Sequence, residues 1–571
     1  MNNKPQISFS RWKPIEIMLA VLFLIAPFYY HPNIGGEGLR IPNNITVWMV
    51  ASIIIFYSLY LVLKRPEFVV PKYFLYIASF PIIISLAGFI TGVEQPLTWM
   101  FRVLFIWAGL AFLFSLFQHG LEQGRIDRLL LIVVISALLH AVIGIAQIAL
   151  KELPLWLPQS STGVPSGLFQ QINNHASYQV TAIMIAIYLI TRPIISEGKL
   201  RFKLLIIVGV LLSSYLVSHS GSRVGMLSLV LGLLMIIPAL WSRFKQRKAI
   251  SSSVLLMLLL GVCSGLFLGQ GRAIDKTVAM QSGYSGSARL GIYSISIDLI
   301  KQKPLLGHGI GSFPRVWQFS KPDFYKNNPN ATLPPQFVTH PHNETIFWLV
   351  EGGMLSGLSL LIVMVGIVIA LRKVGWHRGG AYAAILLPIG LHTQVELPFY
   401  LSTIHWLLFI FLIMVVMRHN VSINKQTLSL SAKRLVIVSS TSIFVIWLLF
   451  IAHTLRSQYD FNKFYDLSNI EQEPFQYALN NPYLQPNAQW INMSSILYSS
   501  MEQGMVRNVE VYLVWAEQLL LEKPDIDLYK KLADGYYYLG ETNKFCKTIT
   551  KGLSLYPRYE PFQQVLSECR K

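Results

Sequence analysis

The residues best suited to chemistry lie in the stretch HPHNETIFWLVEGG, residues 340–353, where His340 and His342 flank Pro341. Proline disfavours helix at the residue before it, so a helix is expected to begin just after Pro341. The positive end of a helix dipole favours a neutral imidazole, which can accept a proton. His342 is therefore a candidate general base. Residue types do not exclude His340 from that role, and ordinary interfacial polarity would also explain both histidines.

Asn343 and Glu344 follow the histidines, and the sequence then becomes an apolar run long enough to cross a bilayer. The whole chain has this character, since its 571 residues are 53% hydrophobic and only 13% charged. We therefore predict an all-α, polytopic membrane bundle. About thirteen spans are expected, at residues 15–30, 45–63, 73–91, 97–117, 129–150, 176–191, 204–218, 224–241, 250–268, 343–371, 381–395, 401–417 and 435–453.

The net charge of +19 comes from short basic clusters between apolar runs, a pattern typical of cytoplasmic loops rather than of a nucleic-acid surface. The clusters occur in alternate loops, which predicts a cytoplasmic N-terminus. An odd number of spans then places the C-terminal part and the long loop outside, in the periplasm of a bacterium with an inner membrane. The predicted division is a membrane domain at 1–453, a periplasmic loop within it at 269–342, and a soluble domain at 454–571.

The predicted soluble domain is more polar and has no run long enough to span a bilayer. Residues 528–557 alternate two amphipathic helices around Gly540, with a spacing that resembles one tetratricopeptide unit. A generic helical hairpin would explain that spacing nearly as well. Cys546 and Cys569 both lie in this domain, and an oxidising compartment permits a disulfide between them, although the sequence leaves the pairing open.

Other polar residues are expected at the same outer side of the membrane. The set comprises the candidates Arg40, Gln171, Asn173, Arg223, Arg289 and Glu396. Charged residues next to hydrocarbon are costly unless they are paired or functional. Arginine can bind two phosphate oxygens at once, and amide side chains can bind sugar hydroxyls. With a neutral histidine, this set suits a lipid-diphosphate sugar donor.

Nucleotide and metal chemistry are not indicated by the sequence. It has no P-loop and no glycine-rich dinucleotide fingerprint. The outer carboxylates are scattered rather than paired, so no metal and no cofactor are expected. Arginines would then have to offset the charge of the leaving diphosphate.

These segments resemble a known family. HPHNETIFWLVEGG, SGSRVG (220–225) and SARLGIY (287–293) are similar to the signatures of the O-antigen ligase/polymerase superfamily. HPNIGGEGLRIPNN (31–44), PSGLFQQINNHAS (165–177) and HTQVELPFY (392–400) look like the subgroup of bacterial protein O-oligosaccharyltransferases of the PglL type, which includes pilin glycosylases. The resemblance covers most of the chain. It implies a catalytic His342 and donor diphosphate-binding Arg223 and Arg289.

The function expected from this resemblance is transfer of an oligosaccharide from undecaprenyl diphosphate to Ser or Thr hydroxyls of a periplasmic protein such as pilin. The supporting polar residues would be His340, Asn343, Glu344, Gln171, Asn173, Glu396 and Arg40. A ligase to lipid A core and a Wzy-type polymerase are alternatives, because they would share the donor site. A transporter is a remote alternative, since it would need paired charges near the bilayer midplane. The glycan, the acceptor and the oligomeric state stay open.

Overall fold

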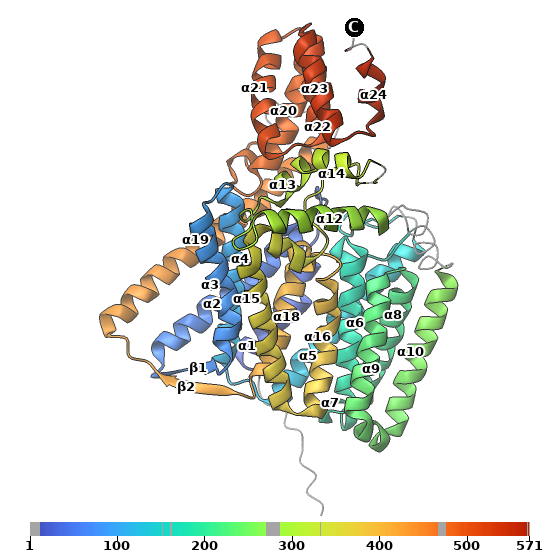
Figure 1. Cartoon of the computed structure of the whole chain (residues 1–571). Helices are drawn as coiled ribbons and strands as arrows, with labels where there is room; N and C mark the ends of the chain where they lie inside the picture. The colour runs from blue at the N-terminus through green and yellow to red at the C-terminus, as the bar shows by residue number, and fades with distance from the viewer. Residues whose placement is uncertain are drawn as a thin grey trace, which may run out of the picture.

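The computed structural model describes residues 12–150, 152–159, 163–269, 286–329, 331, 333–465, 475–567 and 569 (Figure 1). Within them the chain is helical apart from one antiparallel ribbon, in which Glu67 pairs with Lys425 and Pro71 with Val421. The principal elements are α1 (Pro14–Leu24), α2 (Pro42–Lys64), β1 (Glu67–Pro71), α3 (Phe74–Thr91), α4 (Pro96–Phe117), α5 (Gln123–Ala149), α6 (Ile172–Leu189), α7 (Pro193–Ser196), α8 (Leu200–His219), α9 (Arg223–Gln246), α10 (Lys248–Leu268), α12 (Gly286–Gln302), α13 (Phe313–Phe319), α14 (Lys321–Asn327), α15 (Glu344–Val374), α16 (Trp376–His392), α17 (Pro398–Leu401), α18 (Thr403–Met417), β2 (Val421–Lys425), α19 (Leu430–Tyr465), α20 (Gln485–Glu502), α21 (Val506–Glu522), α22 (Ile526–Tyr538), α23 (Thr542–Leu555) and α24 (Glu560–Leu566).

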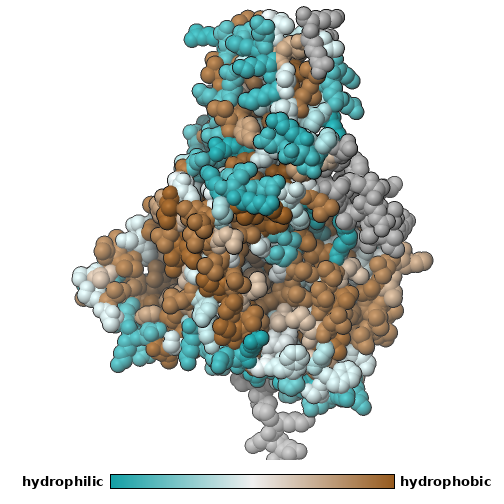
Figure 2. Space-filling view, viewed as in Figure 1, coloured by the Kyte–Doolittle hydropathy of each residue, from teal (hydrophilic) through white to brown (hydrophobic). Residues whose placement is uncertain are grey.

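The predicted all-α membrane class is confirmed. Each of the thirteen predicted spans coincides with a helix, and nine helices in the described part of the chain are long and apolar enough to cross a membrane. Figure 2 shows hydrophobic residues gathered around the helical bundle, with hydrophilic residues above and below them. The number of spans stays a prediction, because α1, α6, α16 and α18 are shorter or less apolar than the nine.

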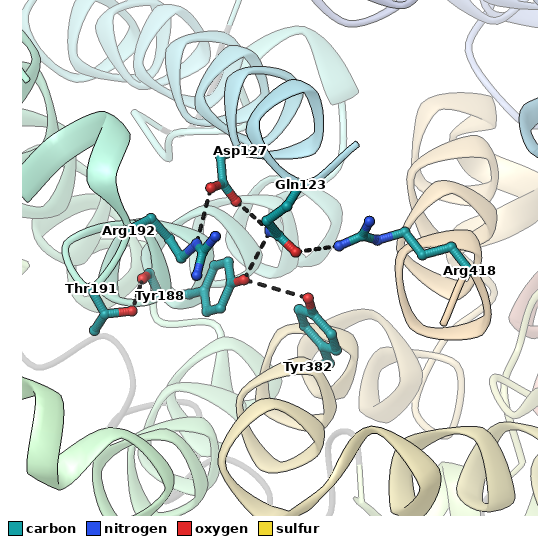
Figure 3. A network of polar contacts seen from close by, with 7 residues as sticks. All are labelled: Gln123, Asp127, Tyr188, Thr191, Arg192, Tyr382 and Arg418. Atoms are coloured by element: carbon teal, nitrogen blue, oxygen red, sulfur yellow. Dashed lines mark hydrogen bonds and ion pairs between the residues drawn. The ribbon is translucent and has the colours of Figure 1, made fainter. Parts of the chain in front are cut away.

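Helix α6 is the centre of the bundle, because nearly all of its residues are buried and it packs against α5, α8, α9 and α16. A polar network surrounds its C-terminal end (Figure 3). There Arg192 Nε donates to Asp127 Oδ2 at 2.9 Å, and the hydroxyls of Tyr188 and Tyr382 lie 3.4 Å apart. Gln123 connects this group to Arg418 after α18. These hydrogen bonds between buried and half-buried side chains fix how α5, α6, α16 and α18 meet.

The predicted periplasmic loop is folded rather than extended where the structure describes it. Residues 270–285 of that loop lie outside the described residues, and α12, α13 and α14 follow them. These three helices form a cap at one end of the bundle, between the bundle and α20–α24 (Figure 1). The cap is joined to the domain above it, since Gln318 of α13 hydrogen-bonds Tyr556 and Arg558 donates to the carbonyl of Ala331.

Helix α19 connects the bundle to the C-terminal domain without a break at the predicted boundary between residues 453 and 454. Asp460, near its end, is buried and accepts hydrogen bonds from the backbone N–H groups of Tyr477 and Ala478 at 2.7 and 2.8 Å. The start of the C-terminal domain is therefore fastened directly to the last membrane helix.

The C-terminal domain contains the predicted helical hairpin. Helices α22 and α23 pack together around Gly540, whose φ of 71° is the left-handed conformation that glycine adopts without strain. Cys546 and Cys569 form a disulfide, which resolves the pairing that the sequence left open. The assignment as a tetratricopeptide unit stays a prediction.

Candidate active site

The start of α15 is built by the HPHN sequence. Pro341 is followed by His342 in a left-handed conformation, with φ of 55°, and then by Asn343 in an extended one. Asn343 is the N-cap, and its side-chain oxygen accepts a hydrogen bond from the Ile346 N–H at 2.9 Å. In the described part of the chain only Gln170 and His342 are non-glycine residues with such a φ. A left-handed histidine costs free energy, so its surroundings must hold it there.

Hydrogen bonds fasten the start of α15 to the turn that follows α16. The Glu344 N–H donates to the carbonyl of Thr393 at 2.9 Å, and Asn343 Nδ2 donates to the carbonyl of Gln394 at 2.9 Å. Thr345 Oγ1 donates to the Gln394 side chain at 3.1 Å. Asn343 therefore holds the backbone at the start of α15 in place. The turn after α16 brings residues that are distant from His342 in the sequence close to it.

The outcome of this arrangement is a cluster of His340, His342 and Glu396. His342 Nδ1 donates to Glu396 Oε1 at 2.9 Å, and His340 Nδ1 lies 3.8 Å from the same oxygen. The His342 backbone N–H donates to His340 Nδ1 at 3.2 Å, so that nitrogen carries a lone pair. The side chain of His342 is 33% exposed, against 17% for His340 and 10% for Glu396. His342 is thus the member most open to a substrate.

The charge states within the cluster follow from its contacts. Burial raises the pKa of Glu396, but the hydrogen bond and charge of His342, with His340 nearby, outweigh burial and leave that pKa below its ordinary value. Burial lowers the pKa of His340, and the neighbouring His342 lowers it further, against the opposing charges of Glu396 and Glu37. The cluster therefore contains an ionised carboxylate and a neutral His340.

The carboxylates of α15 have structural partners. Glu344 accepts a hydrogen bond from the Trp348 indole at 3.1 Å, one turn further along the helix. Glu351 forms a buried ion pair with Arg102 of α4, and it accepts a hydrogen bond from the Phe313 N–H at 3.1 Å. These contacts hold α4, α13 and α15 together beside the cluster. Glu344 and Glu351 therefore stabilise the packing of these helices.

A break within α15 receives the loop that leads from α12 to α13. Gly353 has a φ of 62° inside the helix, and a Cβ there would lie 2.3 Å from the carbonyl oxygen of Leu305. Beside the break, the N–H groups of His308 and Gly309 donate to the carbonyls of Val350 and Glu351, both at 2.9 Å. The second glycine of the EGG sequence therefore allows the cap to lie directly on α15.

The two predicted diphosphate ligands belong to other elements. Arg223 is the first residue of α9, and its N-cap Ser222 donates to Asn173 Oδ1 at 2.8 Å. Gln171 is the N-cap of α6 and accepts from the Asn174 N–H at 2.6 Å. Arg289 lies in the first turn of α12. Gln171 and Asn173 thus shape the start of α6 beside Arg223, and both arginines lie outside the histidine cluster.

Arg40, another predicted supporting residue, lies in the 3₁₀ turn Gly38–Arg40 and pairs with Glu37 at 3.5 Å. The hydroxyl of Tyr483, from the C-terminal domain, donates to the Glu37 carbonyl at 3.5 Å. Because the charge of Glu37 also acts on His340, this turn lies near the cluster and links it to the C-terminal domain.

The sequence did not reveal the pairing of His342 with Glu396, which are 54 residues apart. It also did not reveal a buried polar group in which Ser177 Oγ lies within hydrogen-bond distance of His392 Nδ1 at 2.9 Å and of His405 Nε2 at 3.2 Å. The only sequence signal was that the stretch containing His392, Glu396 and His405 is polar within an apolar region.

Two regions of the chain match known families. Residues 208–362, which include Arg223, Arg289 and the histidine pair, match the family described as O-antigen ligase. Residues 381–569, which include Glu396 and the C-terminal domain, match the family described as virulence factor membrane-bound polymerase, C-terminal. No curated protein matches the chain. One region of the chain is therefore similar to O-antigen ligases and the next to the C-terminal region of membrane-bound polymerases, which supports a ligase-like or polymerase-like membrane enzyme.

Proposed function

We propose that this protein is a bacterial inner-membrane enzyme that transfers an oligosaccharide from undecaprenyl diphosphate to Ser or Thr hydroxyls of periplasmic proteins, pilin among them. The observation that carries the proposal is the His342–Glu396 pair at the start of α15, in a chain that matches the O-antigen ligase family. The protein acceptor rests on the resemblance of residues 31–44, 165–177 and 392–400 to oligosaccharyltransferases of the PglL type.

In this mechanism His342 is the general base. Glu396 accepts the proton on Nδ1, which leaves Nε2 of the neutral imidazole with a lone pair for the acceptor hydroxyl. The hydroxyl oxygen attacks the anomeric carbon as its proton moves to Nε2, the bond from that carbon to the phosphate oxygen breaks, and undecaprenyl diphosphate leaves. The ionised Glu396 stabilises the imidazolium that forms. His340 is a weaker candidate, because it is more buried and its Nδ1 already accepts a backbone N–H.

Arg223 and Arg289 are proposed to bind the diphosphate, where negative charge grows during transfer. Arg289→Lys keeps the positive charge but loses the planar guanidinium, so we expect it to be impaired as well as Arg289→Ala. No metal is required in this scheme, and activity should persist in excess EDTA.

The residue roles can be tested with His342→Ala, Arg223→Ala, Arg289→Ala and Arg289→Lys at equal membrane levels, with donor binding and transfer measured separately. We expect His342→Ala to bind the lipid-linked donor like the parent and to lose transfer by about 10²–10⁴-fold. The arginine variants should bind or transfer donor less well. Arg315→Ala is a matched control, because Arg315 pairs with Glu94 away from the cluster. If His342→Ala still transfers at nearly the parental rate, another residue is the base, and His340 becomes the next candidate.

The acceptor class is tested by deleting the gene and examining periplasmic proteins by intact mass spectrometry and lipopolysaccharide on a gel. Loss of glycan from protein with unchanged lipopolysaccharide is the expected result. The match to the O-antigen ligase family favours a second candidate, a ligase to lipid A core, and the match to the membrane-bound polymerase family favours a polymerase. Shortened lipopolysaccharide with unchanged proteins would favour these two over the protein acceptor.

A further inference from the structure

The cluster that contains the proposed base also has the composition of a metal site. His340, His342 and Glu396 each offer one ligand atom, and these atoms all lie within 4.8 Å of one another. Two imidazole nitrogens and one carboxylate oxygen are the donor set of many zinc sites that keep a further position open. Ions such as Mg²⁺ and Ca²⁺ prefer oxygen ligands throughout, so imidazole nitrogens favour a zinc-like ion.

The distances fit such an ion after small adjustments. Zinc lies about 2.0–2.2 Å from its nitrogen and oxygen ligands, which places two ligand atoms of a tetrahedral site roughly 3.3 Å apart. In the cluster, Glu396 Oε1 lies 2.9 Å from His342 Nδ1 and 3.8 Å from His340 Nδ1, so the two distances bracket that spacing. His340 Nδ1 accepts the His342 backbone N–H at 3.2 Å and lies 3.8 Å from the carboxylate oxygen, so an ion bound between these atoms would replace that hydrogen bond.

The surroundings of the cluster hold the ligands in place and leave an entrance. The α15 start is fastened to the turn after α16 by the Asn343–Gln394 and Glu344–Thr393 hydrogen bonds, and contacts of this kind around a metal site tune its affinity. The 33% exposure of the His342 side chain gives an ion access from outside.

We propose that His340, His342 and Glu396 form a site for Zn²⁺ or a similar divalent transition metal, and that occupation of this site stops glycosyl transfer. The inhibitory part rests on the proposed function. A metal ion on His342 Nδ1 displaces the proton shared with Glu396, and the imidazole takes up one proton from solvent on Nε2, so its tautomer changes with no net release of a proton. The neutral imidazole then carries its hydrogen on Nε2, so Nε2 has no lone pair for the acceptor hydroxyl. Metal binding and general-base action therefore exclude each other.

Metal binding is tested first, without reference to activity. Chelator-treated full-length protein in detergent is titrated with Zn²⁺ and, separately, with Co²⁺, whose visible absorption reports a tetrahedral nitrogen–oxygen site. We expect one ion per chain, and at least tenfold weaker binding in His340→Ala and in Glu396→Gln. His308→Ala is the control, because His308 binds the Leu299 carbonyl outside the cluster. Equal Zn²⁺ affinity in parent, His340→Ala and Glu396→Gln, each shown to be folded by its unfolding temperature, would overturn the site.

Inhibition is tested in a second arm with the parent enzyme, its lipid-linked donor and an acceptor protein. Zn²⁺ should inhibit transfer over the same concentrations at which it binds, and EDTA should restore the full rate. Binding without inhibition would overturn the switch and also count against His342 as the base, whereas absence of binding leaves the proposed function intact. Loss of activity in EDTA that Zn²⁺ restores would also overturn the inhibitory role, because the metal would then support catalysis.

Discussion

Replacing Glu396 by glutamine tests the electrostatic part of the mechanism, because Gln keeps the size of the side chain and removes its charge. The ionised carboxylate lies 2.9 Å from His342 Nδ1, and the imidazole gains a positive charge during transfer. Two unit charges about 4 Å apart interact by about 4 kcal/mol at an effective dielectric constant of about 20. Since about 1.36 kcal/mol corresponds to a tenfold change in rate, we expect kcat to fall by about 10²–10³-fold.

The assay separates an effect on the catalytic step from a general loss of stability. Purified parent and Glu396→Gln enzymes are compared for kcat, for donor KM and for unfolding temperature, with the lipid-linked donor and a periplasmic acceptor protein. We expect kcat to fall while donor KM stays close to the parental value, because Glu396 acts on the base and not on the diphosphate. Glu94→Gln is the matched control, since Glu94 pairs with Arg315 and is not a member of the His340–His342–Glu396 cluster.

Three results would refute this reasoning. A kcat for Glu396→Gln within about threefold of the parent would show that the carboxylate does not stabilise a developing imidazolium. An unchanged kcat with a raised donor KM would instead assign Glu396 to donor binding. A parallel loss of activity and unfolding temperature would identify a structural role.

Three further predictions concern the cap, the C-terminal domain and the membrane orientation. Burial lowers the pKa of Lys321 from 10.5 to about 7. Between these pH values the folded protein binds fewer protons than the unfolded chain, so its stability rises with pH. Lys321→Met should therefore raise the unfolding temperature most below pH 7 and progressively less towards pH 10, and a pH-independent difference would contradict this. The disulfide of Cys546 with Cys569 closes a separation of 23 residues, so Cys546→Ser should destabilise the C-terminal helices by about 3 kcal/mol in denaturant titrations, and an unchanged midpoint would argue against it. A phosphatase reporter fused after Lys571 should be active and one after Lys248 silent, and the reverse pattern would invert the proposed orientation.

The membrane helices could be predicted from the sequence because few backbone conformations are stable in a bilayer. Every backbone polar group in hydrocarbon must be satisfied within its own segment, so an apolar run of about 20 residues becomes a helix. The same local rules located the start of α15, since Pro341 and Asn343 act on neighbouring residues. The helical hairpin around Gly540 was predictable for the same reason. The ribbon of β1 with β2 was not predicted, because it joins strands 350 residues apart in the chain.

Contacts between distant segments were decided only by the tertiary structure. Nothing local distinguishes Glu396, which pairs with His342, from Glu351, which forms a buried ion pair with Arg102. Each pairing depends on which helices pack together and at what height, and side-chain packing over the whole bundle sets that. The sequence by itself therefore determined a membrane helical protein with a candidate base at residue 342. Only the fold placed a carboxylate and a second histidine around that base, because their proximity arises from the packing of α15 against the turn that follows α16.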